Sequence, residues 1–395
     1  MPDKKSKTGT RVVHLGRDAA AFAGAVNPPP FRMSTVLAPD FATYTRPGRK
    51  YEPDTTVYGR YGTPTHHALA NLLTDLEGGA DTVLLPSGLS AITTALFTVL
   101  QSGDHLLMPD SVYGPTRGFC DSILQRMGIT TSYFDPTLAV DRLPDLIQDN
   151  TRALFLESPG SMTFEIQDTP ALSARAKKAG LTVLMDNTWA TPLYFRPLEH
   201  GVDLSIQAGT KYIVGHSDAM LGAITANTEW AQALRTTFYN MGSIAGSEET
   251  YLALRGIRTL EVRLPRHWDN GVRVAEWLQT HPEVAAVHHP ALPSHPQHHL
   301  WQRDFDGASG LFAFVLAAPH DAEALARLTD DLTLFGLGSS WGGYESLIVP
   351  GYPAPKRRAG GLPESGPIIR LHIGLEDPED LIEDLAAGLE RLSKA

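Results

Sequence analysis

The chain has 395 residues, which is long enough for two or three domains with large hydrophobic cores. Its 33 basic and 44 acidic residues give a net charge of −11, and a protein this acidic without a long basic tract is not expected to bind nucleic acid. No apolar run has the length of a membrane span, and the polar first residues lack the apolar core of a signal peptide. The single cysteine, Cys120, excludes an internal disulfide and fits a reducing compartment, so we expect a cytoplasmic protein.

Residues 1–60 show little hydrophobic periodicity and are interrupted by prolines at 28–30, 39, 47 and 53. Such a segment cannot form a core of its own. We therefore expect an extended N-terminal arm over 1–60 that is held by packing on another domain or on a neighbouring subunit.

From residue 61 the pattern alternates between short apolar runs and segments with helical spacing. Strands are expected over 81–86, 105–108, 130–134, 153–156 and 181–185, with helices between most of them. This alternation predicts an α/β domain over 61–258, built on a mostly parallel sheet that is covered on both faces. In such sheets ligands bind beyond the carboxyl ends of the strands.

The last third of the chain predicts a smaller α+β domain over 259–395. Helices are expected over 247–264, 266–279, 321–328 and 377–392, and strands over 310–316, 346–349 and 368–373. Residues 288–299 hold five histidines among prolines, at spacings that match no zinc pattern. We interpret this stretch as a proline-broken surface loop, whose role the sequence leaves open.

The most informative stretch is 203–218, where a short apolar strand ends in small residues and then delivers Thr210 and Lys211. A lone lysine at such a place usually extends to solvent. A buried lysine has a lowered pKa, because burial disfavours the ammonium form, and its amine then becomes a nucleophile toward carbonyl groups. The other strand ends decide between these two interpretations.

Three further strand ends carry groups that suit one cofactor. The turn at 87–91 opens a helix whose free amides can bind a phosphate. Tyr113 can stack on a planar ring, and Asp186 is a carboxylate that needs a cationic partner such as a protonated pyridine nitrogen. Each signal is weak alone, but together with Lys211, and in this order, they predict a site for pyridoxal 5′-phosphate (PLP).

The residues that form this set also carry a resemblance. Ser205-Ile-Gln-Ala-Gly-Thr-Lys-Tyr-Ile-Val-Gly-His-Ser-Asp218 resembles the lysine signature of the cysteine/methionine-metabolism family of fold-type I PLP enzymes. The likeness covers nearly the whole chain, and within the family it is greatest to the bacterial cystathionine β-lyases. The stretches that carry this finer resemblance are 58–63, 156–161, 186–190, 340–346 and 369–376.

The resemblance implies a role for each matching position. Lys211 would hold the cofactor covalently and act as acid and base, and Asp186 would pair with the pyridinium nitrogen. Tyr113 would stack on the ring and, as phenolate or hydrogen-bond partner, take a proton from the substrate amine. The phosphate would be bound by Gly88, Leu89 and Thr210.

The same resemblance implies a substrate site and an oligomer. Arg370 would bind the substrate α-carboxylate through its planar fork, and Ser340 and Trp341 would line the pocket. Tyr58 and Arg60 would reach the phosphate site of a neighbouring subunit. The expected assembly is a homotetramer built from two dimers.

Departures from the wider family favour the β-lyase branch. Ala208 replaces a frequent serine, Ser161 and Met162 stand where γ-lyases and γ-synthases carry Asn-Pro, and Pro115 replaces the cysteine of methionine γ-lyases. The implied activity is β-elimination of cystathionine to homocysteine, pyruvate and ammonia, in methionine biosynthesis. Ser339 replaces a residue that is often bulkier, so a broader cysteine-S-conjugate lyase stays open, as does γ-elimination or γ-replacement on the same scaffold.

Two other classes are disfavoured. A non-catalytic protein on this fold is expected to have lost Lys211, Asp186 or Arg370, and all three are present. A nucleotide-binding α/β protein is expected to carry Gly-x-Gly-x-x-Gly after its first strand, and that motif is absent there.

Overall fold

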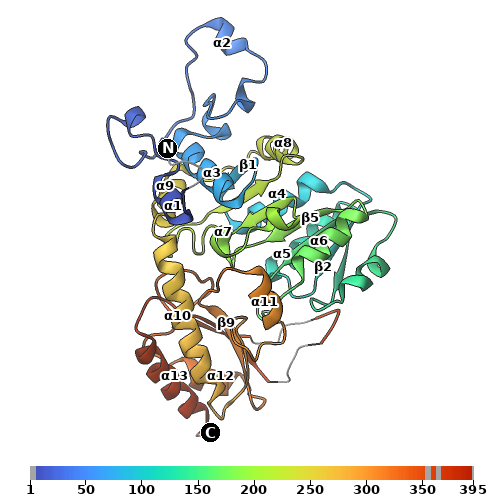
Figure 1. Ribbon diagram of the computed structural model, residues 1–395, viewed down its shortest axis with the longest axis vertical. Coiled ribbons are helices and arrows are strands. Elements are labelled where there is room, and N and C mark those ends of the chain that lie inside the picture. The colour runs from blue at the N-terminus through green and yellow to red at the C-terminus, as the bar shows by residue number, and fades with distance from the viewer. Residues whose placement is uncertain (1–5, 352–356, 362–365, 394–395) are drawn as a thin grey trace.

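The computed structural model describes residues 6–351, 357–361 and 366–393. Two sheets lie one beyond the other along the longest axis, and the long helix α10 (Leu260–Gln279) runs beside the smaller of them (Figure 1). The N-terminal arm projects past the larger sheet at the opposite end of the molecule from the C-terminus.

The larger sheet has the strand order β1-β7-β6-β5-β4-β2-β3. Its strands are β1 (Asp81–Leu85), β2 (His105–Pro109), β3 (Thr130–Phe134), β4 (Thr151–Glu157), β5 (Thr182–Asp186), β6 (Leu204–Gln207) and β7 (Gly222–Ala226). The pairs from β3 to β6 are parallel, and β7 runs antiparallel to both of its neighbours. The predicted, mostly parallel sheet is confirmed.

Neighbouring residues of the central strands enter two separate cores, which explains why these strands are apolar on both faces. Leu106 and Phe155 belong to one core, whereas Leu107 and Leu154 belong to the other. The helices of this part of the chain are α3 (Pro64–Glu77), α4 (Gly88–Val99), α5 (Gly114–Phe119), α6 (Thr169–Lys178), α7 (Thr191–Tyr194), α8 (Ala231–Met241) and α9 (Ser247–Ile257).

The smaller sheet has the order β10-β11-β12-β9-β8. Its strands are β8 (Val284–His288), β9 (Leu311–Leu316), β10 (Gly336–Leu337), β11 (Leu347–Pro350) and β12 (Ile368–His372). Its helices α10, α12 (Ala322–Thr329) and α13 (Pro378–Ser393) share one core with the sheet, and α11 (His298–Asp304) lies toward the larger sheet (Figure 1). Ile369 and Leu371 enter this core, so Arg370 and His372 face the other way.

The expectation of one helix over 247–264 is wrong. The chain breaks between α9 and α10, and α10 begins at Leu260 although it contains Pro265. Arg263 donates hydrogen bonds to the carbonyl oxygens of Tyr212 and Gly256, at 2.8 and 2.9 Å. These contacts fix the start of α10 against the segment after Lys211, and local sequence does not reveal them.

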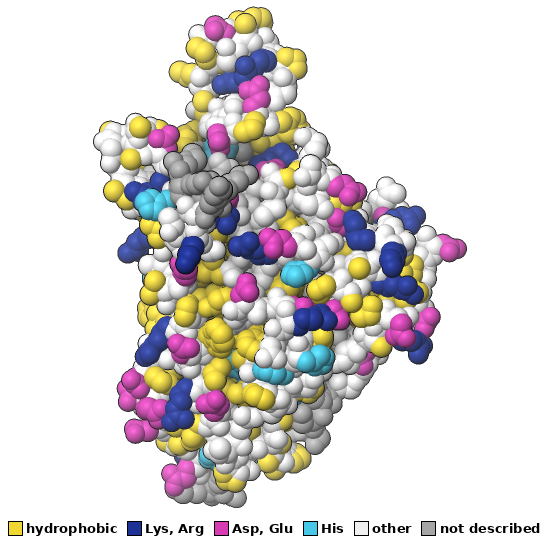
Figure 2. Space-filling model, in the orientation of Figure 1, with side chains coloured by type: hydrophobic (Ala, Val, Ile, Leu, Met, Phe, Trp, Pro, Cys, Tyr) yellow, Lys and Arg dark blue, Asp and Glu magenta, His cyan; other side chains and the backbone are white. Residues whose placement is uncertain are grey.

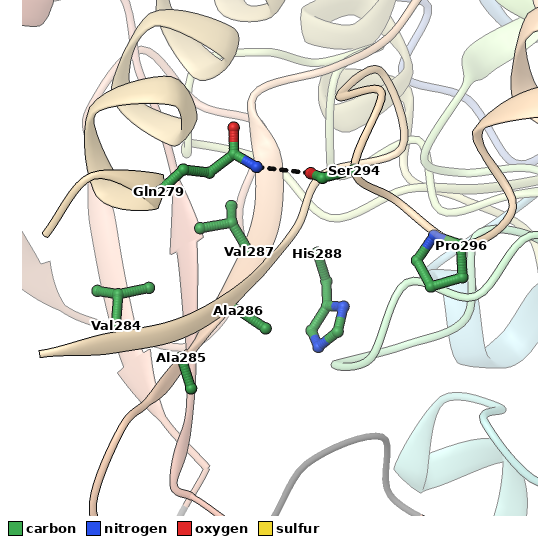
Figure 3. A pocket seen from close by; sticks show the side chains of 8 residues that line it. All are labelled: Gln279, Val284, Ala285, Ala286, Val287, His288, Ser294 and Pro296. Carbon is green, nitrogen blue, oxygen red and sulfur yellow. Dashed lines mark hydrogen bonds between the residues drawn. The ribbon is translucent and has the colours of Figure 1, made fainter. Parts of the chain in front are cut away.

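The interpretation of 288–299 as a surface loop is also wrong in part. His288, His289 and His295 are buried, and burial lowers the pKa of His289 to about 3 and that of His295 to about 4. Neutral imidazoles can be buried when they find partners, as His295 does with the carbonyl oxygen of Phe164. Figure 3 shows His288 at a hollow of about 260 Å³ beside β8, the end of α10 and the loop at Ser294.

The arm contains more structure than expected, namely the short helices α1 (Thr8–His14) and α2 (Phe41–Thr45). Its outer part presents apolar side chains among charged ones (Figure 2), and Leu37 and Phe41 are 87% and 80% exposed. Within the described residues, no helix combines the length and the apolar character needed to cross a membrane.

Candidate active site

A cavity of about 530 Å³ lies where the carboxyl ends of β4, β5 and β6 face the smaller sheet. Most of the predicted site residues line this one cavity, from both parts of the chain. They are Gly88, Leu89, Tyr113, Asp186, Thr210, Lys211, Ser340, Trp341 and Arg370.

Lys211 follows β6 and extends its amine toward the loop of the smaller domain. Its Nζ donates to Ser340 Oγ at 2.5 Å and lies 5.5 Å from the ring centre of Trp341. Burial, and after it the charge of Arg370, lowers the pKa of Lys211 from 10.5 to about 8, while Asp186 acts in the opposite direction. Roughly a tenth of these amines are therefore neutral and nucleophilic at pH 7, far more than for an ordinary lysine.

Asp186 ends β5 and lies in register with Glu157, which ends β4. It accepts hydrogen bonds from Thr188 N at 3.0 Å and from Thr188 Oγ1 at 2.5 Å. Burial raises the pKa of Asp186, and no ion pair with it is found among the residues that the structure describes. The carboxylate can therefore receive a cation from within the cavity.

The start of helix α4 also lines the cavity. Ser87 caps it by accepting from Ser90 N at 3.1 Å. A Cβ at Gly88 would lie 2.5 Å from the Cβ of Ala208, so glycine is required for this helix start to approach the strand that leads to Lys211. The amides at the first turn and the helix dipole together favour an anion here.

Arg370 reaches the cavity from β12. Its Nη2 donates to the carbonyl oxygen of Ser340 at 3.3 Å, and burial lowers its pKa without removing its charge. The remaining guanidinium donors can bind a carboxylate in a bidentate manner.

Comparison with known proteins agrees with this geometry. The family model described as Cys/Met metabolism PLP-dependent enzyme matches residues 9–390. The chain belongs to this family.

Two curated relatives and one solved structure illustrate the likeness. A putative cystathionine beta-lyase of Rhizobium johnstonii is 47% identical, and the match covers 97% of this chain and 96% of the relative. A cystathionine beta-lyase of Escherichia coli is 44% identical, and the match covers 99% of this chain and 100% of the relative. The crystal structure of a cystathionine gamma synthase from Xanthomonas oryzae superposes with a TM-score of 0.90 at 32% identity, and covers both chains completely.

Members of this family are PLP-dependent, and the cavity fits that cofactor. It offers helix amides for the phosphate, the Tyr113 ring for stacking, a carboxylate without an ion-pair partner among the described residues for the pyridinium nitrogen, and the Lys211 amine for the aldehyde. Thr210 also lines the cavity, where its Oγ1 already bonds to the backbone of Leu221.

Tyr58 and Arg60 do not line the cavity of their own chain. Arg60 donates to the carbonyl oxygen of Tyr239 and to the hydroxyl of Tyr61, and Tyr58 is 44% exposed. Their predicted place in a neighbouring subunit's site stays a prediction.

Several residues of the cavity have no role that the sequence alone predicts. Glu157 is buried and accepts from Tyr113 N at 2.9 Å, so it fixes the backbone at Tyr113. Its position at the end of a strand, as for Asp186, was the available signal. Thr188 links the two strand ends, since its Oγ1 accepts from Ala208 N at 2.8 Å and donates to Asp186. The apolar wall is formed by Met162, Phe164, Trp189, Leu311 and Val349.

Proposed function

We propose that the chain catalyses the PLP-dependent β-elimination of L-cystathionine to homocysteine, pyruvate and ammonia, a carbon–sulfur lyase step of methionine biosynthesis in the cytoplasm. The observation that carries the proposal is the Lys211 amine, held by Ser340 in one cavity with the Arg370 guanidinium. The names of the Rhizobium johnstonii and Escherichia coli relatives support the choice of substrate.

In this proposal Arg370 binds the α-carboxylate and orients the substrate, with its Cα proton toward Lys211. Bound PLP stabilises the negative charge that forms on Cα. The neutral Lys211 amine removes the Cα proton, the Cβ–S bond breaks, and the same amine returns the proton to the departing sulfur of homocysteine. The remaining three-carbon enamine takes up water and gives pyruvate and ammonia.

Tyr113 acts beside this lysine as a hydrogen-bond partner of the substrate amine. Burial raises the pKa of its phenol, with Asp186 and Glu157 adding to the effect and Arg370 opposing it. The neutral phenol is therefore the form that we assign near neutral pH, rather than the phenolate.

A broader cysteine-S-conjugate lyase is the second candidate. The small Ser339 and the apolar wall with Met162 and Phe164 suit a bulky or apolar group on sulfur. The γ-elimination and γ-replacement reactions stay as the alternative on the same scaffold, given the name of the Xanthomonas oryzae structure.

The proposed assembly is a homotetramer of two dimers, in which the arm over 1–60 crosses to a neighbour and places Tyr58 and Arg60 at its phosphate site. The exposed apolar side chains of the arm support this, because such a surface is costly to leave in water. In this division of the chain, residues 1–60 form the arm that contacts the neighbouring subunit, 61–258 form the PLP-binding domain and 259–395 form the smaller domain. Sedimentation velocity of the full chain tests the assembly, and the PLP affinity of an Arg60→Ala variant with the same sedimentation behaviour tests the shared site.

The decisive experiment incubates the purified protein and PLP with L-cystathionine and identifies both products. We expect pyruvate together with homocysteine. Cysteine together with 2-oxobutyrate would contradict the proposal and move the chain to the γ-lyases. S-alkyl cysteines measured in parallel, with wild type and Ser339→Tyr, decide the second candidate: selective loss of bulky substrates in the variant would support it.

A further inference from the structure

His372 is a buried histidine close to the candidate active site that the proposed reaction does not use. It lies two residues after Arg370 on β12, so both side chains leave the strand on the same face. His372 is 1% exposed, and its ring lies 5.9 Å from that of Tyr212, the residue after Lys211.

The imidazole of His372 contacts the backbone of one turn. Its Nε2 lies 3.1 Å from Gly342 N and 3.0 Å from the carbonyl oxygen of Gly343. One tautomer accepts from the Gly342 amide, and the other donates to the Gly343 carbonyl. Either tautomer therefore holds the Gly342–Gly343 turn.

That turn packs directly on the backbone of Lys211. Gly342 has a φ of +88°, and a Cβ there would lie 2.8 Å from the carbonyl carbon and 2.9 Å from the Cα of Lys211. Ser340, two residues before Gly342, also has a positive φ, +86°, which is unusual for a residue with a side chain. This strained segment presents the Ser340 hydroxyl to Lys211 Nζ and the Ser340 carbonyl to Arg370.

We propose that His372 is a positioning residue, which fixes the 340–343 segment and through it the Lys211 amine and the Arg370 guanidinium. The inference rests on the proposed function only in requiring that Lys211 attach PLP. Burial lowers the pKa of His372 to about 4, with the nearby charges of Arg370 and Lys211 adding to the effect. The ring is thus neutral where the enzyme works, and Nε2 either accepts from the Gly342 amide or donates to the Gly343 carbonyl, while Nδ1 has no hydrogen-bond partner among the described residues.

The test compares two substitutions of similar size. In His372→Gln the side-chain amide reaches as far as Nε2 and offers both an acceptor and a donor, whereas in His372→Met neither is present. We expect His372→Met to slow turnover roughly 10–100-fold and to raise KM for the amino acid, as displacement of reacting groups does. His372→Gln should stay within about threefold of wild type, because it restores the hydrogen bond.

A second readout is independent of the substrate. The rate of PLP attachment to the apo-protein is measured from the visible absorbance of the attached cofactor. We expect a slower rate in His372→Met than in His372→Gln when the two variants have the same melting temperature. Failure of cystathionine turnover in wild type would overturn the proposed function alone, since attachment needs no substrate. Equal behaviour of the Met and Gln variants in both assays would overturn the role of His372.

A further variant covers the case in which His372→Met does not fold. His372→Asn keeps a polar side chain that is too short to reach Gly342, so we expect it to behave as His372→Met does. Combining it with Ser340→Ala should give less than the product of the two single effects, because both act on one segment. Full multiplicativity would show that His372 does not act through Ser340, and would refute the proposal.

Discussion

The lowered pKa of Lys211 can be measured in the apo-protein. The amine attacks the PLP aldehyde only when it is neutral, so the attachment rate should rise with pH and level off above the pKa. Since burial and Arg370 lower this pKa from 10.5 to about 8, about half of the Lys211 amines are neutral at pH 8. An ordinary lysine is then only roughly 0.3% neutral, so the structure gives Lys211 a roughly 150-fold advantage.

The assay mixes apo-protein with PLP at pH values from about 6 to about 10, a range centred on the expected midpoint of about 8, and records the visible band of the attached cofactor. An Arg370→Met variant removes the positive charge near Lys211, and its midpoint should move upward toward that of an ordinary lysine. Lys211→Ala supplies the baseline, because it has no amine to attach. A wild-type rate that climbs about tenfold per pH unit without levelling off would refute the reasoning.

Three further substitutions test the site. Lys211→Ala should lower turnover by more than about 10⁴-fold, beyond the contribution of a proton-transfer group alone, and near-normal turnover would remove Lys211 from the mechanism. Arg370→Lys keeps a charge but loses the fork, so KM should rise about tenfold or more with kcat less affected, whereas Arg273→Lys, an exposed exchange on α10, should change neither. Gly342→Ala should lower the melting temperature and slow PLP attachment, since its Cβ meets the Lys211 backbone, and an unchanged protein would contradict the described packing.

Much of the large domain could be predicted from the sequence, because its strands are buried on both faces. Continuous apolar runs of about five residues then mark strands, and the polar residue that ends each run marks the site. Asp186 and Lys211 were both identified in this way, and the structure places them at one cavity. The cofactor could be predicted from residue chemistry, because the phosphate, the aromatic ring, the pyridinium nitrogen and the aldehyde of PLP each require a different kind of protein group.

Contacts between distant segments were decided only by the tertiary structure. The hydrogen bond from Lys211 to Ser340 joins residues 129 positions apart, and Glu157 meets Asp186 through the register of two parallel strands. Neither pairing can be predicted from the sequence around the residues, because hydrophobic periodicity and secondary-structure propensity depend only on residues that are close in sequence. The same holds for His372, whose Nε2 meets a turn that lies 29 and 30 positions earlier in the chain.

Burial explains the remaining differences. His289 and His295 lie in a stretch whose composition is typical of a surface loop, yet both are buried as neutral rings. The loop after β8 packs against a distant part of the chain, where His295 contacts the carbonyl oxygen of Phe164. The sequence by itself thus determined the chemistry of the site, through residue types at strand ends. The tertiary structure decided which of these groups touch and which are desolvated, because burial and pKa depend on everything packed around a side chain.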